Sequence, residues 1–185
     1  MKFENTKVMN FEGATRGTRN PLESWARSDS KYDENGEYIV GPNDLGLMQR
    51  LLKASIAQGN SHSKFMRQIL VCVDITAPLY WWKETDQYRV GVTTNSESTM
   101  HRLAKTPITL DCFETDDYDP DLSLAYDRKD DDYDDGLDDI SVYVEDMIIV
   151  MENLRKAYLA TDDKRYWKEL IRLLPEGWLQ KRTTT

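Results

Sequence analysis

Side chains that can hold a phosphate or polarise a ring are concentrated between Gly59 and Arg102. The cationic members of this set are His62, Arg67, Lys83, Arg89 and Arg102. A polar run, Thr93-Thr-Asn95-Ser-Glu-Ser98, follows Arg89. Guanidinium groups bind phosphate oxygens through two parallel hydrogen bonds, whereas Asn and Ser at a helix start either cap the helix or contact a ligand. The residue types therefore predict either a site for a phosphorylated ligand or a capped helix with surface charge.

The elements that must position these residues surround one apolar strand. Gln68–Thr76 is β-branched and apolar, carries few charges and ends before Pro78, which is typical of a mostly buried strand. Upstream, apolar residues recur at helical spacing from Asn43-Asp44 to Gly59-Asn60, so a helix should precede the strand. Downstream, the composition favours a helix over Leu79–Glu84 and another from Asn95 or Ser96 through Leu103.

The remaining segments complete one predicted domain covering residues 1–185. Residues 3–41 are polar and glycine-rich and predict irregular structure with short strands, anchored by Trp25 and Tyr38. Residues 111–139 hold fourteen acidic side chains and predict a solvated, mobile insertion. Two amphipathic helices follow, over residues 144–158 and after Asp162-Asp163. This order predicts an α/β (α+β) fold, a central sheet flanked by helices.

Composition excludes several classes of function. The formal charge of -9 disfavours binding to a nucleic-acid polymer, although a few converging arginines can still hold a nucleotide. Cys72 and Cys112 are the only cysteines, so a disulfide framework is absent and a reducing, cytoplasmic compartment is expected. The longest apolar run, Ile69–Val73, is far too short to span a membrane.

Other chemistries lack the required spacing. In the acidic segment, starting a calcium loop at Asp130 or Asp131 leaves one required position wrongly filled. His62, His101 and the two cysteines have no zinc-ligand spacing, so no metal is predicted. The sequence also contains no Gly-x-Ser-x-Gly elbow, no Gly-x-Gly-x-x-Gly motif and no Walker loop.

The segment after Pro78 resembles the signature of the flavin-dependent thymidylate synthases, Arg-His-Arg-x-x-Ser-x-Asn-Glu-x-Ser-x-Arg. Arg89 corresponds to its second arginine, and Asn95 and Ser98 correspond to its asparagine and later serine after a one-residue insertion. The segment around His62 is similar to the family's Gly-His-x-Ser element, and Ile171-Arg172-Leu-Leu-Pro175 is similar to its Ala-Arg-x-x-Leu-Pro element. The resemblance covers residues 44–182 without the acidic insertion.

The signature is degenerate at three positions. Gln87 and Tyr88 replace its first arginine and its histidine, and Met100 stands where its third arginine is expected. The flavin and substrate contacts made by those residues in the family would therefore differ here. The departures are compatible with transfer of a one-carbon unit other than a methyl group.

The resemblance implies a ThyX-like, mostly antiparallel sheet and a homotetramer that binds FAD and a pyrimidine deoxynucleotide such as dUMP. It implies transfer of a one-carbon unit to C5 with reduced flavin, and NADPH and methylenetetrahydrofolate as co-substrates. By the same correspondence Ser98 would be the catalytic residue facing the pyrimidine. His62, Arg67 and Arg89 would contact the flavin, and the nucleotide contacts would come from Arg89, Asn95, Ser98 and Arg172. The paired Trp81 and Trp82 would stack on a ring or pack in the core.

Two further hypotheses remain open at the level of sequence. A noncatalytic nucleotide-binding module of the same fold would explain the replaced signature residues. An acidic protein-interaction domain would use the segment 111–139 to engage a basic partner and would need no pocket. Flavin content and a response to nucleotide distinguish the three.

Overall fold

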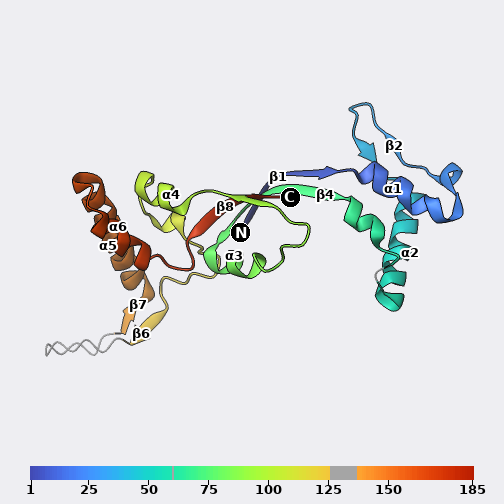
Figure 1. The fold of residues 1–185 in the computed structure, drawn as a ribbon. Coiled ribbons are helices and arrows are strands. Elements are labelled where there is room, and N and C mark those ends of the chain that lie inside the picture. Colours follow the sequence, from blue (N-terminus) through green and yellow to red (C-terminus); the bar gives the residue numbers. More distant parts are fainter. Residues whose placement is uncertain (60, 126–136) are drawn as a thin grey trace. The chain divides into compact units, whose positions relative to one another are not determined.

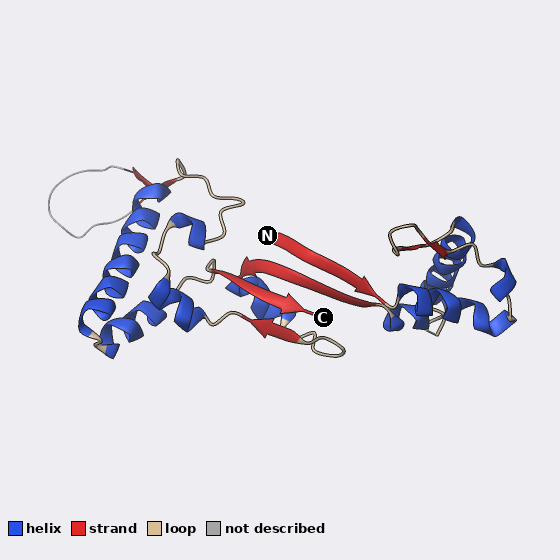
Figure 2. Cartoon of the chain, turned by 90° about the horizontal axis from the view of Figure 1, so that it is seen from above, coloured by secondary structure: helices blue, strands red, loops and turns tan. Residues whose placement is uncertain are grey.

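In the computed structural model, a four-stranded sheet in the order β1-β4-β8-β5 connects segments far apart in sequence (Figures 1 and 2). Its strands are Lys2–Met9, Leu70–Pro78, Leu179–Thr184 and Thr94–Ser96, respectively. The structure describes residues 1–59, 61–125 and 137–185. The fold is α+β, as the order of elements predicts, and the sheet is mostly antiparallel, as the family resemblance implies.

The described chain forms two compact units. The first comprises Met1–Phe3 and Ile75–Thr183, and the second comprises Glu4–Asp74 and Thr184–Thr185. We call them the β8 unit and the α2 unit. The strands β1 and β4 each run from one unit into the other along the chain. The prediction of a single domain over the whole chain is not tested by this division.

The α2 unit is mostly helical. It holds α1 (Phe11–Arg19), α2 (Pro42–Gln58) and the short strands β2 (Lys31–Tyr32) and β3 (Tyr38–Ile39), with 3-10 turns at Asn20–Leu22, Trp25–Arg27 and Lys64–Gln68. Its small core consists of Ala14, Met48 and Phe65, packed by Leu51, Leu52 and Ile69. Proline in the first turn starts α2, and Gly59 ends it with a φ of 94°, which a side chain would disfavour. The predicted helix at 43–58 is thus confirmed.

The β8 unit contains the larger core. Its helices are α3 (Leu79–Thr85), α4 (Thr99–Lys105), α5 (Ile140–Thr161) and α6 (Lys164–Arg172), with a 3-10 turn at Leu110–Cys112. The fully buried side chains at its centre are Leu103, Met151, Leu170 and Trp178, joined by Ile108, Cys112 and Phe113. None of the described helices combines the length and apolar character that a membrane crossing requires.

Two short paired strands lie within the acidic segment 111–139. The strand β6 (Ser123–Ala125) pairs antiparallel with β7 (Leu137–Asp139), and the backbone N–H of Ile140 donates to the Leu122 carbonyl at 2.8 Å. Residues 126–136, the middle of the predicted mobile insertion, lie outside the described residues. Within the described part of the chain, no group of His, Cys, Asp or Glu side chains is arranged to hold a metal ion.

Three local expectations need correction. The polar N-terminal segment forms the strand β1 and the helix α1, because pairing and packing compensate for the two glycines in α1. The helix expected to begin at Asn95 or Ser96 begins instead at Thr99, since Thr94–Ser96 pairs as β5. The strand β4 is buried only in its second half, whereas Leu70 and Val71 are exposed.

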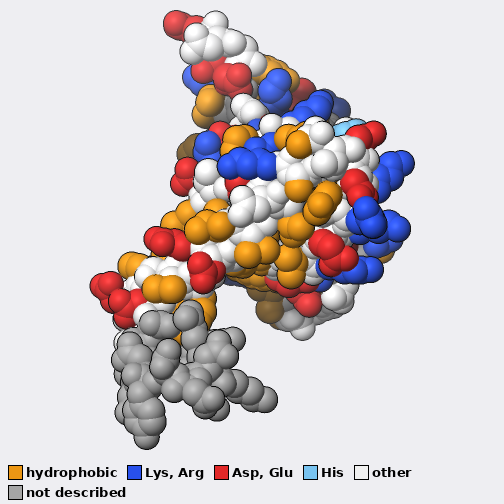
Figure 3. Space-filling view, turned by 90° about the vertical axis from the view of Figure 1, so that its left-hand side faces the viewer, with side chains coloured by type: hydrophobic (Ala, Val, Ile, Leu, Met, Phe, Trp, Pro, Cys, Tyr) orange, Lys and Arg blue, Asp and Glu red, His pale blue; other side chains and the backbone are white. Residues whose placement is uncertain are grey.

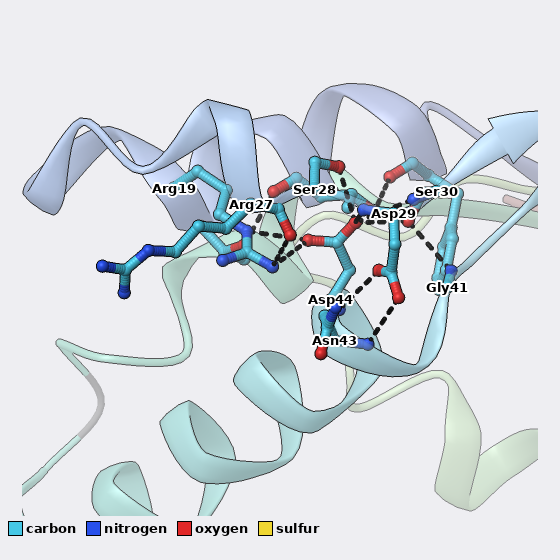
Figure 4. A network of polar contacts seen from close by, with 11 residues as sticks. Arg19, Arg27, Ser28, Asp29, Ser30, Gly41, Asn43 and Asp44 are labelled. Atoms are coloured by element: carbon cyan, nitrogen blue, oxygen red, sulfur yellow. Dashed lines mark hydrogen bonds and ion pairs between the residues drawn. The ribbon is translucent and has the colours of Figure 1, made fainter.

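A buried carboxylate organises the α2 unit (Figure 4). The side chain of Asp44 is fully buried and its Oδ1 accepts from Arg19, with Nε at 2.8 Å and Nη2 at 2.6 Å. Its Oδ2 accepts from the hydroxyls of Ser28 and Ser30 and from the backbone N–H groups of Asp29 and Ser30. Burial would raise the pKa of Asp44, but the hydrogen bonds from Ser28, Ser30 and Arg19 outweigh it and lower the pKa to about 2.

A second carboxylate–guanidinium pair stabilises the β8 unit. Glu152 Oε1 accepts from Arg155 Nη2 at 2.6 Å, and Glu152 Oε2 accepts from the backbone N–H of Ile108 at 2.9 Å. Arg155 also donates to the Ala104 carbonyl, so the pair connects α5 to the end of α4. The hydrogen bond from Arg155 is the main reason that the pKa of Glu152 falls to about 2.

Lowering the pH should destabilise the protein through Asp44 and Glu152. Their folded-state pKa values of about 2 lie below the ordinary values of 3.8 and 4.5. A carboxyl group of this kind stabilises the fold above its unfolded pKa, and that stabilisation is lost as the pH falls through the folded pKa. We expect protonation of each group to lower the free energy of unfolding by about 2 kcal/mol between about pH 5 and about pH 2. Urea titrations across this range measure the loss, and Asp44→Asn should show a smaller pH dependence than the wild type. An equal dependence in both proteins would contradict the assignment to Asp44.

Candidate functional site

The β8 unit has a shallow hollow of about 190 Å³ between the end of α3 and β5. Its lining residues are Thr85, Asp86, Tyr88, Arg89, Val92 and Thr94. Thr85 ends α3 and Thr94 begins β5, so the lining comes from the loop that joins these two elements. Gly91, with a φ of 75°, allows this loop to turn back on itself. The site is therefore built by a local loop held between two regular elements.

The cationic group of the hollow is Arg89. Its Nε donates to the carbonyl of Asp86 at 2.6 Å, which restricts the guanidinium to one side of the loop. The Asp86 carboxylate does not pair with Arg89, because its Oδ1 accepts from Arg182 Nη1 at 2.7 Å. Arg182 in turn lies over the ring of Trp82, 4.3 Å from the centroid. A guanidinium oriented in this way suits a phosphate or carboxylate ligand.

An exposed aromatic ring stands beside that cation. The side chain of Tyr88 is 75% exposed, and Val92 is also exposed. An exposed tyrosine ring offers a flat apolar face for stacking, and Thr85 and Thr94 also line the hollow. The lining can thus contact a planar ring and an anionic group together.

Of the four residues predicted to contact the nucleotide, Arg89 alone lines the hollow. Asn95 lies in β5, exposed and next to the lining residue Thr94. Ser98 is exposed and caps α4, where its Oγ accepts from the backbone N–H of His101 at 3.4 Å. The structure therefore shows the capping role that the sequence left open, and Ser98 stays a prediction as a catalytic residue.

The other predicted site residues are all exposed. His62 and Arg67 lie in the α2 unit, with Arg67 in the 3-10 turn Lys64–Gln68 that follows α2. Arg172 ends α6 in the β8 unit, and its Nη1 donates to Glu169 at 2.5 Å. Figure 3 looks onto the side on which α5 and α6 lie in Figure 1, and there basic side chains are mixed with acidic ones. The proposed roles of these residues at a shared site remain predictions.

Several residues near the hollow were not singled out from the sequence. Asp86 and Val92 carry no motif, and Arg182 lies near the end of the chain, 96 positions after its ion-pair partner Asp86. Trp82 belongs to the core, because it is almost fully buried and its Nε1 donates to the Gln180 carbonyl at 3.0 Å. The match of Arg89 to the family signature and the polar run Thr93–Ser98 are the sequence signals that point to this loop.

Comparisons with known proteins identify the fold and nothing finer. No protein-family model matches the sequence, and no curated protein matches it. A crystal structure of Thymidylate Synthase X (ThyX) from Helicobacter pylori with FAD and dUMP is similar with a TM-score of 0.58 and 16% identity, covering 100% of this chain and 77% of that chain. A second structure of this H. pylori protein complexed with FAD and dUMP gives 0.59 and 15%, with the same coverage. A UMP/dUMP methylase, PolB from Streptomyces cacaoi bound with 5-Br dUMP, gives 0.47 and 14%, covering 99% and 70%. The chain therefore has a ThyX-like fold.

Proposed function

We propose that this chain, which has a ThyX-like fold, binds a pyrimidine deoxynucleotide of the dUMP type. We further propose that it transfers a one-carbon unit to C5 of the pyrimidine with reduced flavin. The observation that carries the proposal is the likeness, over the whole chain, to structures described as complexes with FAD and dUMP. The arginine-lined hollow in the segment that resembles the family signature adds independent support.

In this proposal the β8 unit binds the nucleotide. Arg89 pairs with the phosphate, Tyr88 stacks on a planar ring, and Asn95 and Ser98 supply amide and hydroxyl groups to the pyrimidine. Arg172 would bind phosphate after its hydrogen bond to Glu169 is broken. Hydrogen bonds directed at the pyrimidine stabilise negative charge that develops on the ring, and a fixed geometry reduces the entropic cost of the reaction.

The residues available for FAD fit an anionic cofactor in their chemistry. Arg67 is exposed and has no hydrogen-bond or ion-pair partner among the described residues, so its guanidinium is available for a diphosphate. His62 is exposed five positions before it. Bound FAD would supply the hydride, with NADPH as reductant and methylenetetrahydrofolate as the one-carbon donor. A homotetramer, which light scattering would detect, belongs to the same proposal.

A noncatalytic nucleotide-binding module is the second candidate. It is favoured by the capping contact of Ser98 and by Gln87 and Tyr88 at two signature positions. In this case the chain would keep the nucleotide contacts of Arg89 without flavin chemistry. The acidic protein-interaction domain becomes the remaining explanation if neither flavin nor nucleotide binds.

Purified full-length protein separates these candidates. The enzyme should show a flavin absorption spectrum after FAD is added and excess removed, and dUMP should raise its melting temperature. The binding module should respond to dUMP while retaining no flavin. A protein that retains no flavin and has the same melting temperature with and without saturating dUMP or dCMP would refute both.

Replacing Arg89 by alanine should weaken dUMP binding. The change removes a charge-assisted contact with phosphate, and we expect a loss of about 1.5 kcal/mol or more, which is at least about tenfold in Kd. Isothermal titration with dUMP and with deoxyuridine tests the assignment, because the nucleoside should lose little affinity. Arg16→Ala, which removes an exposed arginine from the α2 unit, is the matched control. Unchanged dUMP affinity in Arg89→Ala would remove this residue from the site.

A further inference from the structure

The turn that carries Ser98 is held by the last strand of the β8 unit. We infer that Gln180 of β8 is a positioning residue for Ser98, a role that rests on the proposed function. Gln180 is 7% exposed, and its Nε2 donates to the Glu97 carbonyl at 3.2 Å and to the Thr99 hydroxyl at 2.9 Å. One buried amide thus contacts the residues on both sides of Ser98.

The amide of Gln180 has a defined orientation. Its Oε1 accepts from Arg182 Nε at 2.8 Å, which directs Nε2 toward the turn. The backbone carbonyl of Gln180 accepts from the indole of Trp82, a side chain that is almost fully buried. Both polar atoms of the amide are hydrogen-bonded. Rotation of the side chain would therefore leave these buried atoms without partners.

Glu97 completes the attachment of the turn. Its backbone N–H donates to the Lys181 carbonyl at 3.0 Å, and its Oε1 accepts from the Lys181 N–H at 2.9 Å. The same Oε1 accepts from Arg102 Nη1, which also donates to the Leu179 carbonyl. The turn is therefore bonded to Gln180 and Lys181 of β8, although it lies more than 80 positions earlier in the chain.

These contacts hold the Glu97 backbone and the Thr99 side chain on either side of Ser98, while Ser98 itself is exposed. That arrangement is expected of a ligand-contacting group, because a reacting hydroxyl must be held in place by its neighbours. A helix cap alone needs only the Ser98 hydroxyl and the first N–H groups of α4. Gln180 is not among the lining residues of the hollow, and its amide donates to the neighbours of Ser98, so it acts through the position of the turn.

Gln180→Glu tests this role with little change in volume. An oxygen replaces Nε2, so the donor to Glu97 is lost and a negative charge faces a carbonyl. We expect kcat with dUMP to fall about tenfold or more, with KM within about twofold, because displacement affects the oriented reaction more than binding. Gln49→Glu, the same change at an exposed position of α2, should leave both constants unchanged.

Combining Gln180→Glu with Ser98→Ala distinguishes a positioning role from general destabilisation. In Ser98→Ala, Gln180→Glu should have almost no further effect on kcat, since the group that it positions is absent. Equal losses in both backgrounds, or an unchanged kcat in the wild-type background, would overturn the inference. Hydrogen exchange of peptides covering residues 96–101 should be faster in Gln180→Glu, and unchanged exchange would overturn it as well.

The remaining outcomes are also decisive. If Gln180→Glu does not fold, Thr99→Val removes one of the two contacts, and a wild-type kcat in that variant would refute the role. A wild-type protein that binds neither flavin nor dUMP refutes the proposed function and this inference together. Wild-type turnover that Gln180→Glu does not alter refutes the positioning role alone.

Discussion

Ser98→Ala should lower kcat for the one-carbon transfer to dUMP by about 10²-fold or more, while changing dUMP affinity by less than about threefold. The reason is that a hydroxyl directed at the pyrimidine stabilises charge that develops during the reaction, whereas the phosphate contributes most of the ground-state binding. Steady-state kinetics combined with isothermal titration of dUMP measures the two effects separately.

The capping contact of Ser98 requires a matched variant. Alanine also removes the acceptor for the His101 N–H, which costs about 1 kcal/mol of helix stability. Asparagine caps helices as well as serine does but lacks the hydroxyl, so Ser98→Asn should retain the melting temperature and lose kcat as alanine does. Wild-type turnover in Ser98→Asn would mean that this residue only caps α4.

Asp44→Ala should lower the free energy of unfolding of the α2 unit by about 3–5 kcal/mol. The substitution leaves the Arg19 guanidinium, whose side chain is 7% exposed, buried without its carboxylate. It also removes the acceptor of the Ser28 and Ser30 hydroxyls. Urea unfolding followed by circular dichroism, with hydrogen exchange of α1 and α2, gives the loss and locates it in this unit.

Two comparisons make the Asp44 result specific. Glu12→Gln breaks the exposed pair between Glu12 and Arg16 on the same helix as Arg19, and it should cost no more than about 1 kcal/mol. Replacing both partners with apolar residues, as in Asp44→Leu with Arg19→Met, should recover part of the loss because no charge is left buried. A cost for Asp44→Ala no greater than that of Glu12→Gln would refute the central role of the network.

The resemblance to the thymidylate synthase family predicts the fold from sequence, although the signature is degenerate. The structural similarity to ThyX confirms the α+β fold. It does not test Ser98, Asn95, His62, Arg67 or Arg172, whose roles stay predictions. Arg89 is the one predicted site residue that the structure places in the hollow.

Local patterns in the sequence were sufficient for the elements whose burial follows a helical or strand period. The helices α2, α5 and α6 are of this kind, because each presents apolar residues at helical spacing, whereas β4 was predicted from a continuous apolar, β-branched run. The strand β8 and the helix α1 have no such pattern: β8 is largely polar, and α1 contains two glycines. They form because pairing and packing with distant segments compensate for weak local preference.

The partners of the polar groups at the centre of each unit were decided only by the tertiary structure. The sequence predicts Asp44 as a residue at the start of a helix, but it is fully buried and its partners lie between residues 19 and 30. Gln180 and Arg182 carry no motif, but β8 brings them to Glu97 and Asp86, more than 80 positions away. Local periodicity indicates which face of a segment is buried. The partner of a buried polar side chain is set by the tertiary structure, because distant segments must come together before each buried donor can reach an acceptor.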